Sequence, residues 1–289
     1  MSVFFCDSNS ELWYTKAEEL GLKVIGMPYN IDNDEERAYD LGKNTDFNDF
    51  YTRLKKGSSA KTSALNEQNY IDYFEPVLAS GNDVLYVHFS RKMSGTFEYM
   101  DQAIKILKKK YPKNSVKCVD TQSIAIGEAI IVYEAGKMWK NGASDEEIID
   151  FVIKNRENYA MYFLVDDLKH LKKGGRLSTT SFVVGTMLNI KPILKISSEG
   201  TIVKHCVAKG RKKGLNQLFE IFKTLNENAK DYPICIAHAI AEEDAMELKK
   251  MIENYISEPL EIWFQPIGPT VGTHGGPGSI GLAFHSKQR

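Results

Sequence analysis

A single histidine stands among glycines near the C-terminus, where the chain could bring it against a ligand. Residues 272–278 read Gly-Thr-His-Gly-Gly-Pro-Gly and follow an apolar, strand-like run over residues 260–267. Glycines at this density let the backbone adopt positive φ or approach a ligand closely, and Pro277 stiffens the loop. His274 could therefore donate a hydrogen bond to a ligand or a partner protein. The alternative is a tight turn in which the histidine has no part in binding.

Two other short runs place hydroxyl groups at the expected starts of helices. Residues 61–63 read Lys-Thr-Ser before a predicted helix, with the serine as its expected N-cap, and residues 94–96 read Ser-Gly-Thr after an apolar strand. Helix N-termini present unpaired N–H groups and partial positive charge to anions. Thr62, Ser94 and His274 together would therefore form a site for a carboxylate or a phosphate, although helix capping alone would also explain Ser94.

Ser94 also raises the question of an enzyme. It lacks the G-x-S-x-G surroundings of a nucleophilic serine, and no Asp–His pair can be assigned to it. Residues 276–281 fit G-x-G-x-x-G, but the rest of the chain reads as a strand rather than the helix that a dinucleotide site needs, and residues 57–62 lack the glycines of a Walker loop. No nucleotide site follows. A small-molecule hydrolase or transferase using Ser94 and His274 remains the second hypothesis.

One basic run is followed by a glycine pair that is expected to end its helix. Residues 171–176 read Leu-Lys-Lys-Gly-Gly-Arg, and the glycine pair is expected to end a short helix. Cations favour helix C-termini, and most basic runs are simply solvated. Because this basic run is the one with a glycine pair, we predict that Lys172, Lys173 and Arg176 form a partner-docking surface.

The elements that must position these residues alternate between strands and helices in the first half of the chain. We expect strands over 3–6, 22–27, 84–89 and 116–119, and helices over 46–56, 124–139 and 145–156, with two more after residues 63 and 94. This alternation predicts a parallel sheet, whose ligands gather beyond the carboxyl ends of the strands. In the second half, residues 192–196 and 201–207 flank a Ser-Ser-Glu-Gly turn and predict a hairpin. The fold class is therefore α/β, with an N-terminal parallel-sheet domain over 1–158 and a C-terminal mixed α+β sheet domain over 159–289.

The composition argues against several classes of protein. Of 289 residues, 43% are hydrophobic and 26% are charged, and the formal net charge is −1. We therefore expect a globular protein with no compositional support for nucleic-acid binding. No run approaches the roughly 18 apolar residues of a spanning helix, and the N-terminus reads as a strand rather than a signal peptide. The four cysteines lie far apart in apolar runs, which argues against zinc and disulfide chemistry. We expect a cytoplasmic protein with no metal and no cofactor.

Seven fragments spread along the chain resemble the motifs of the DegV family of bacterial fatty-acid-binding proteins. In family order they are residues 7–8, 61–63, 90–96, 119–121, 171–178, 188–194 and 272–278. Each fragment is weak alone, but seven in order extend the resemblance over essentially the whole chain. Two fragments depart from the family pattern: Ala64-Leu65 stands where the family usually has Gln-Pro, and Arg91-Lys92-Met93 is bulkier than is common before the serine.

The resemblance implies two α/β domains with a long-chain fatty acid between or beneath them. The acyl tail would lie in an apolar tunnel, which the apolar residues 182–188 could line. The carboxyl group would lie at the domain junction. There Thr62, Ser94 and His274 match the family's carboxyl-binding residues, and Arg211 matches a basic residue sometimes found near that site.

The resemblance also implies a role. Such proteins present the fatty acid to a separate fatty-acid kinase, similar to dihydroxyacetone kinases, which converts the carboxylate to an acyl-phosphate for phospholipid synthesis. This role allows transient contact with a membrane. The missing nucleotide loop fits a carrier rather than an enzyme. At about 0.8 kcal/mol for each methylene, a tail of about fifteen methylenes would gain on the order of 12 kcal/mol gross, part of which is offset by ordering the tail.

Overall fold

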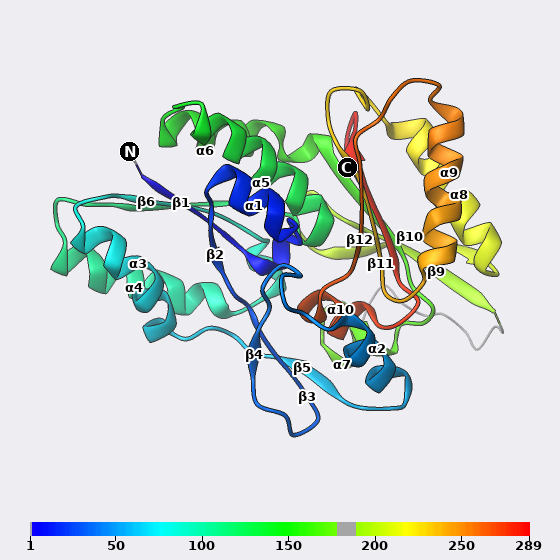
Figure 1. Cartoon of the computed structure of the whole chain (residues 1–289), viewed down its shortest axis with the longest axis horizontal. Coiled ribbons are helices and arrows are strands. Elements are labelled where there is room, and N and C mark those ends of the chain that lie inside the picture. Colours follow the sequence, from blue (N-terminus) through cyan, green and yellow to red (C-terminus); the bar gives the residue numbers. More distant parts are fainter. Residues whose placement is uncertain (1, 178–188) are drawn as a thin grey trace.

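The computed structural model of the protein describes residues 2–177 and 189–289. Its first lobe contains a parallel sheet with the strand order β2-β1-β6-β7, as the alternation of strands and helices predicted (Figure 1). The strands are β1 (Val3–Asp7), β2 (Lys23–Ile25), β6 (Val84–His88) and β7 (Val116–Asp120). Every residue of β6 is buried, which explains its unbroken apolar run, because helices cover both faces of this sheet.

The helices of the first lobe lie in two layers. Helices α3 and α4 lie on one side of the sheet, and α1, α5 and α6 lie on the other (Figure 1). The bounds are α1 (Tyr14–Leu20), α3 (Glu67–Ala79), α4 (Thr96–Lys110), α5 (Ala125–Lys140) and α6 (Asp145–Asn155), with 3-10 turns η1 (Ser8–Ser10), η2 (Arg91–Met93) and η3 (Arg156–Asn158). Helix α5 also contacts strands β8, β11 and β13 of the second lobe. It therefore joins the two lobes.

Helix α3 begins later than the sequence predicted. Its first residue is Glu67, and Asn66 is its N-cap: the Asn66 side chain accepts from the N–H of Asn69, and the Asn69 side chain accepts from the N–H of Asn66. The prediction that Ser63 is the N-cap is therefore wrong, because this reciprocal pair fixes the helix start three residues further along. Thr62 consequently ends a strand and does not initiate a helix.

A small antiparallel sheet, absent from the sequence-based prediction, is inserted between β2 and α3. Its strand order is β4-β3-β5, with β3 (Pro28–Ile31), β4 (Arg37–Ala38) and β5 (Ala60–Thr62), and α2 (Phe47–Lys55) connects β4 to β5 (Figure 1). The hydroxyl of Tyr51 in α2 donates to the carbonyl of Ile267 at 2.8 Å. This insertion therefore attaches to the second lobe and carries Thr62 toward it.

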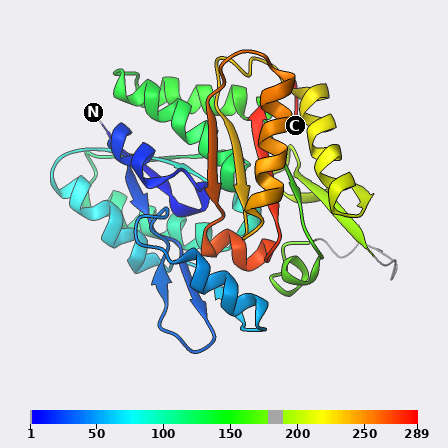
Figure 2. The ribbon, with the colours of Figure 1, turned by 45° about the vertical axis from the view of Figure 1, so that its right-hand side comes forward.

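The second lobe is the mixed sheet that the sequence predicted, with the strand order β10-β9-β8-β13-β11-β12. Its strands are β8 (Tyr159–Leu164), β9 (Ile190–Ile196), β10 (Ile202–Lys209), β11 (Ile234–His238), β12 (Ile262–Pro266) and β13 (Ile280–His285). The predicted hairpin is the antiparallel pair β9–β10. Helices α8 (Arg211–Leu225) and α9 (Glu242–Tyr255) cover the side of the sheet away from the first lobe (Figure 2).

Strand β8 shows how this sheet serves two cores. Its alternate residues Ala160, Tyr162 and Leu164 pack in the cluster beneath α8 and α9. Met161 and Phe163 belong to the large cluster that continues into the first lobe. Because successive side chains of a strand point to opposite faces, one strand can serve both cores. The face that carries Met161 and Phe163 is the one that lines the candidate site.

Two short helices complete the fold, α7 (Lys169–Lys173) and α10 (Pro269–Gly275). The glycine-rich run that carries His274 is therefore partly helical, where the sequence predicted a loop. Residues 182–188, which were expected to line a tunnel, lie outside the described residues. No helix in the described parts of the chain has both the length and the apolar character needed to cross a bilayer.

Candidate ligand-binding site

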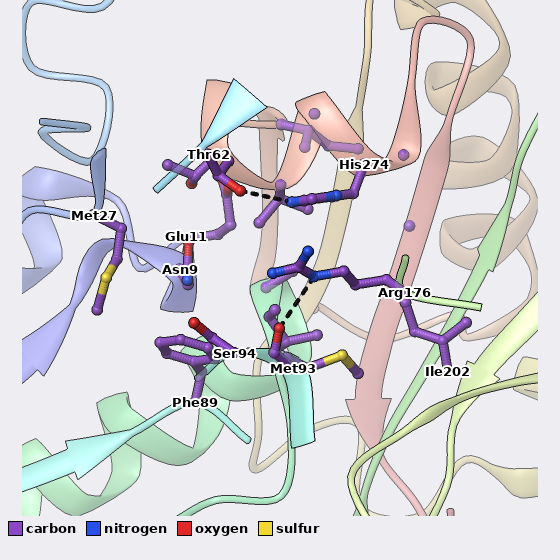
Figure 3. A pocket seen from close by; sticks show the side chains of 18 of the residues that line it. Asn9, Glu11, Met27, Thr62, Phe89, Met93, Ser94, Arg176, Ile202 and His274 are labelled. Atoms are coloured by element: carbon purple, nitrogen blue, oxygen red, sulfur yellow. Dashed lines mark hydrogen bonds between the residues drawn. The ribbon is translucent and has the colours of Figure 1, made fainter. Parts of the chain in front are cut away.

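A cavity of about 190 Å³ lies between the two lobes. Much of its wall is apolar and comes from both lobes, including Phe89, Ile126, Met161, Phe163 and Ile202. Several polar side chains also line it, among them Thr62, Ser94, Arg176 and His274 (Figure 3). The structure thus brings Thr62, Ser94 and His274, which are far apart in the sequence, to the wall of one cavity.

His274 is held in a neutral form near neutral pH. Its Nε2 lies 2.9 Å from the hydroxyl oxygen of Thr62. Burial, followed by the positive charges of Arg176 and His170, lowers the pKa of His274 to about 4. Its Nδ1 is buried and has no hydrogen-bond partner among the described residues. The imidazole can therefore form a hydrogen bond with Thr62 or with a ligand while the ring remains uncharged.

Two glycines have a packing role, Gly174 directly after α7 and Gly276 directly after α10. A Cβ at Gly174 would overlap the Nδ1 of His274. A Cβ at Gly276, whose φ is 78°, would overlap the ring of His170. Both glycines therefore allow the ends of α7 and α10 to approach closely. Side chains at either position would displace one of the two histidines.

Ser94 lies directly before α4, where Gly95 is the N-cap. The hydroxyl oxygen of Ser94 accepts from the N–H of Thr96 at 3.2 Å, which leaves its own O–H available. Thr96 is buried and hydrogen-bonds both the N–H and the carbonyl of Leu65, at 3.1 and 3.2 Å. Thr96 therefore fixes the segment after Thr62 against the start of α4. Its role was not visible in the sequence, because Leu65 lies far away along the chain.

Arg176 is the site residue whose place the sequence did not reveal. The sequence assigned it with Lys172 and Lys173 to a docking surface, but only the two lysines are exposed. The Nε of Arg176 donates to the carbonyl of Met93 at 3.1 Å, its Nη1 donates to the carbonyl of Gly174, and its guanidinium lines the cavity beside His274 (Figure 3). Burial lowers the pKa of Arg176. It forms no ion pair within the described residues, so it can pair with an anion in the cavity.

Arg211 lies elsewhere. It is the first residue of α8 and lines a separate polar cleft. Its Nη1 lies 3.2 Å from Oδ1 of Asp166, and its Nε lies 2.7 Å from Oδ2 of Asp244. The structure therefore does not bring Arg211 together with Thr62, Ser94 and His274, because two aspartates hold its guanidinium at the start of α8 and α9.

Glu11 is a buried carboxyl group that the sequence reading missed. It also lines the cavity, accepts from the N–H of Gly268 at 2.9 and 3.0 Å and accepts from the hydroxyl of Tyr39 at 3.3 Å. Its backbone carbonyl accepts from the side chain of Gln265 at 2.6 Å. Burial raises the pKa of Glu11 to about 8. Because Gly268 is the N-cap of α10, Glu11 links the first lobe to the helix that carries His274.

Ser94 and His274 are not arranged as a nucleophile and its base. A nucleophile and base must lie within hydrogen-bonding reach, with a third group that orients the base. Among the described residues, the hydrogen-bond partner of His274 is Thr62 rather than Ser94, and no carboxylate reaches its Nδ1. The arrangement instead gathers two hydroxyl groups, a guanidinium and a neutral imidazole at one part of an apolar cavity. These groups can donate hydrogen bonds to a carboxylate.

Comparison with known proteins gives a consistent result. Residues 4–287 match the family described as "Uncharacterised protein, DegV family". A DegV domain-containing protein of Clostridium perfringens is 35% identical over 283 residues, which cover 98% of this chain and 96% of the relative. A fatty-acid-binding DegV family protein from Thermus thermophilus has 25% identity and a TM-score of 0.85, with 98% of this chain and 99% of that chain covered. DegV from Bacillus subtilis, a fatty acid binding protein, has 25% identity and a TM-score of 0.84, with 99% of each chain covered.

Proposed function

The chain belongs to the DegV family, and from this premise we propose that it binds a long-chain fatty acid in the cavity between its lobes and presents the carboxyl group to a separate fatty-acid kinase. Structural relatives from Thermus thermophilus and Bacillus subtilis bind fatty acids. The observation that carries the proposal is the composition of the cavity, an apolar wall with Thr62, Ser94, Arg176 and His274 among its polar groups.

The proposed head-group site matches the chemistry of a carboxylate. Arg176 supplies a cation that is partly withdrawn from water, and a buried charge is favourable only when it is paired. Thr62 and Ser94 supply O–H groups, and His274 adds a neutral ring nitrogen. A fatty-acid carboxylate would complete this set, and its tail would lie against Phe89, Met161 and Phe163. The gain from burying the tail would offset the cost of ordering it.

The proposed role is that of a carrier. Phosphoryl transfer from a nucleoside triphosphate to a carboxylate oxygen needs a nucleotide site, which the sequence motifs do not supply to this chain. A kinase that brings the nucleotide would need access to the carboxylate from outside. The Thr62 and His274 side chains line both the cavity and a second, outer depression, which supports such an access route to the proposed head group.

Denaturing extraction of the purified protein, followed by mass spectrometry, tests the binding step. We expect one acyl chain for each protein chain, or stoichiometric binding of added palmitate or oleate to delipidated protein. A protein that carries no lipid and binds neither acid would contradict the proposal. Turnover of activated esters, lost in both Ser94→Ala and His274→Ala variants, would support the hydrolase or transferase instead.

A further inference from the structure

The side of α10 that lines the cavity carries polar side chains at two levels. Thr270 and His274 are four residues apart in this helix, and both line the cavity. Residues at this spacing lie on one face of a helix, about 6 Å apart along its axis. His274 contacts Thr62 at the level proposed for the carboxyl group. Thr270 therefore belongs to a second level of the wall, nearer the beginning of α10.

The hydroxyl group of Thr270 has no hydrogen-bond partner in the parts of the chain that the structure describes. Its oxygen is buried, and the residue as a whole is 3% exposed. Thr273 in the same helix differs, because its hydroxyl donates to the carbonyl of Pro269 at 2.7 Å. A buried hydroxyl without a partner is unfavourable, and most buried polar groups in proteins are paired. Thr270 therefore keeps an unused donor and acceptor at the cavity wall.

The carboxyl group of Glu11 also comes close to the beginning of α10. It accepts from the N–H of Gly268, two residues before Thr270, and its side chain is part of the cavity wall (Figure 3). Burial raises the pKa of Glu11 to about 8, so the group is mostly neutral at neutral pH. A neutral carboxyl group has one O–H to donate and an oxygen that still accepts. Glu11 and Thr270 can therefore both donate and accept at this level.

A saturated acyl chain makes no use of these two groups. Methylenes form no hydrogen bonds, so a chain that passes Thr270 leaves its hydroxyl against hydrocarbon, which is unfavourable. A hydroxyl group on the chain would satisfy the wall, because it can donate to one oxygen and accept from the other group. The two levels are close together, so such a hydroxyl would lie within the first several carbons of the chain.

We propose that Glu11 and Thr270 form a subsite for a hydroxyl group, and that the ligands of this cavity include fatty acids hydroxylated near their carboxyl end. This inference rests on the proposed fatty-acid function and names a substrate class for the same cavity. The subsite differs in chemistry from the carboxyl-binding level, because its two side chains are uncharged near neutral pH. It would select a neutral polar group rather than an anion.

Titration calorimetry with palmitate and with the separate enantiomers of 3-hydroxypalmitate and 5-hydroxypalmitate tests the subsite. We expect one of these enantiomers to bind the delipidated wild-type protein about threefold to tenfold more tightly than palmitate, as a neutral hydrogen bond allows. Thr270→Val, which removes the hydroxyl and keeps a similar shape, should abolish this preference. Palmitate has no hydroxyl group to place there, so its affinity should change less than about twofold. Thr270→Ser restores a hydroxyl and should retain the preference.

Thr273→Val is the matched control. Thr273 lies in the same helix but lines the outer depression and not the cavity. Its variant loses the hydrogen bond to Pro269, so its thermal unfolding temperature should fall while the preference for the hydroxylated acid remains. The unliganded Thr270→Val variant should unfold at the same temperature as wild type or higher, because it loses no hydrogen bond.

The outcomes separate this inference from the function on which it rests. If palmitate binds but none of the hydroxylated enantiomers binds more tightly, the hydroxyl subsite is wrong and the fatty-acid site stands. The same holds if Thr270→Val keeps the preference, or weakens palmitate and the hydroxylated acids equally. If neither palmitate nor any hydroxylated acid binds the wild-type protein, the fatty-acid site fails and the subsite fails with it.

Discussion

Two arginines of this protein lie in opposite electrostatic settings. Arg211 in the polar cleft is paired with Asp166 and Asp244. Arg176 in the cavity wall donates to the carbonyls of Met93 and Gly174 and has no carboxylate partner among the described residues. The sequence suggested the reverse arrangement, with Arg211 near the ligand and Arg176 on a docking surface.

The difference shows what distinguishes a binding site from a charged surface. In the cleft two aspartates already pair with the Nε and Nη1 of the Arg211 guanidinium, so a ligand anion would compete with them. In the cavity, burial lowers the pKa of Arg176, so an incoming carboxylate would relieve an unfavourable state. Glu11 is similar to Arg176 in that it forms no ion pair among the described residues, and burial is the main cause of its raised pKa. Substitutions in the two regions should therefore have different consequences.

The largest expected effect is on stability, from Glu11→Gln. Below about pH 4.5 the Glu11 carboxyl is neutral in both the folded and unfolded chains; as the pH rises toward about 8 only the unfolded chain releases its proton, so the wild-type protein loses stability over this range. Each pKa unit corresponds to about 1.4 kcal/mol. The glutamine cannot titrate, so the free energy of unfolding of the variant relative to wild type should rise by several kcal/mol from pH 5 to pH 8.5, measured by urea denaturation.

Asp244→Asn is the control for that experiment. It removes a partly exposed carboxylate that is already paired with Arg211. The free energy of unfolding should therefore fall by no more than about 1 kcal/mol, and the variant should not become more stable relative to wild type as the pH rises. A constant difference between Glu11→Gln and wild type at every pH would mean that Glu11 is not a buried neutral carboxyl.

The next largest effect concerns the two arginines directly. Arg176→Gln should lower palmitate affinity about tenfold to a hundredfold, because a hydrogen bond to a charged group contributes about 1.5–3 kcal/mol. Arg211→Gln should change it less than about threefold, because its guanidinium is paired outside the cavity. Isothermal titration of delipidated variants with palmitate measures both. Equal losses for the two variants would break the distinction between cavity and cleft.

A smaller effect is expected from the hydroxyl groups. Ser94→Ala and Thr62→Ala should each weaken fatty-acid binding by roughly 0.5–1.5 kcal/mol if they donate neutral hydrogen bonds. The Thr62 variant also removes the partner of His274. If the double variant binds palmitate as tightly as wild type in the same titration, the carboxyl group lies elsewhere.

The smallest effect concerns docking to the proposed fatty-acid kinase. The structure separates the predicted docking cluster, since Arg176 lines the cavity and Lys173 lines the outer depression beside it, while Lys172 is exposed and lines neither of them. Lys172→Glu should therefore slow acyl-phosphate formation a few-fold at low ionic strength, with fatty-acid affinity unchanged, because a rim charge acts mainly on encounter. Kinase rates at low and high salt measure this, with the exposed Lys212→Glu as control. Equal rates for Lys172→Glu and wild type at low salt would leave Lys172 a solvated surface residue.

Local patterns were sufficient for most of the fold. The parallel first sheet follows from apolar strands that alternate with amphipathic helices, and the β9–β10 hairpin follows from its turn residues. The order of the family-like fragments indicated that Thr62, Ser94 and His274 belong together, and one cavity receives all three. Glycine density marked positions where chain segments approach closely, as Gly174 and Gly276 do beside the two histidines.

Tertiary structure decided the properties that depend on which distant groups are paired. The sequence around Arg211 does not indicate that Asp244, on another helix, forms an ion pair with it. Likewise, the sequence around Arg176 does not indicate that this side chain is partly buried beside Met93. Glu11 looks like an ordinary acidic residue until Gly268 and Tyr39 enclose it. Charge and residue type are local and can be read from the sequence. Burial and pairing arise only when segments far apart in the chain meet, and these contacts determine which polar groups remain available for a ligand.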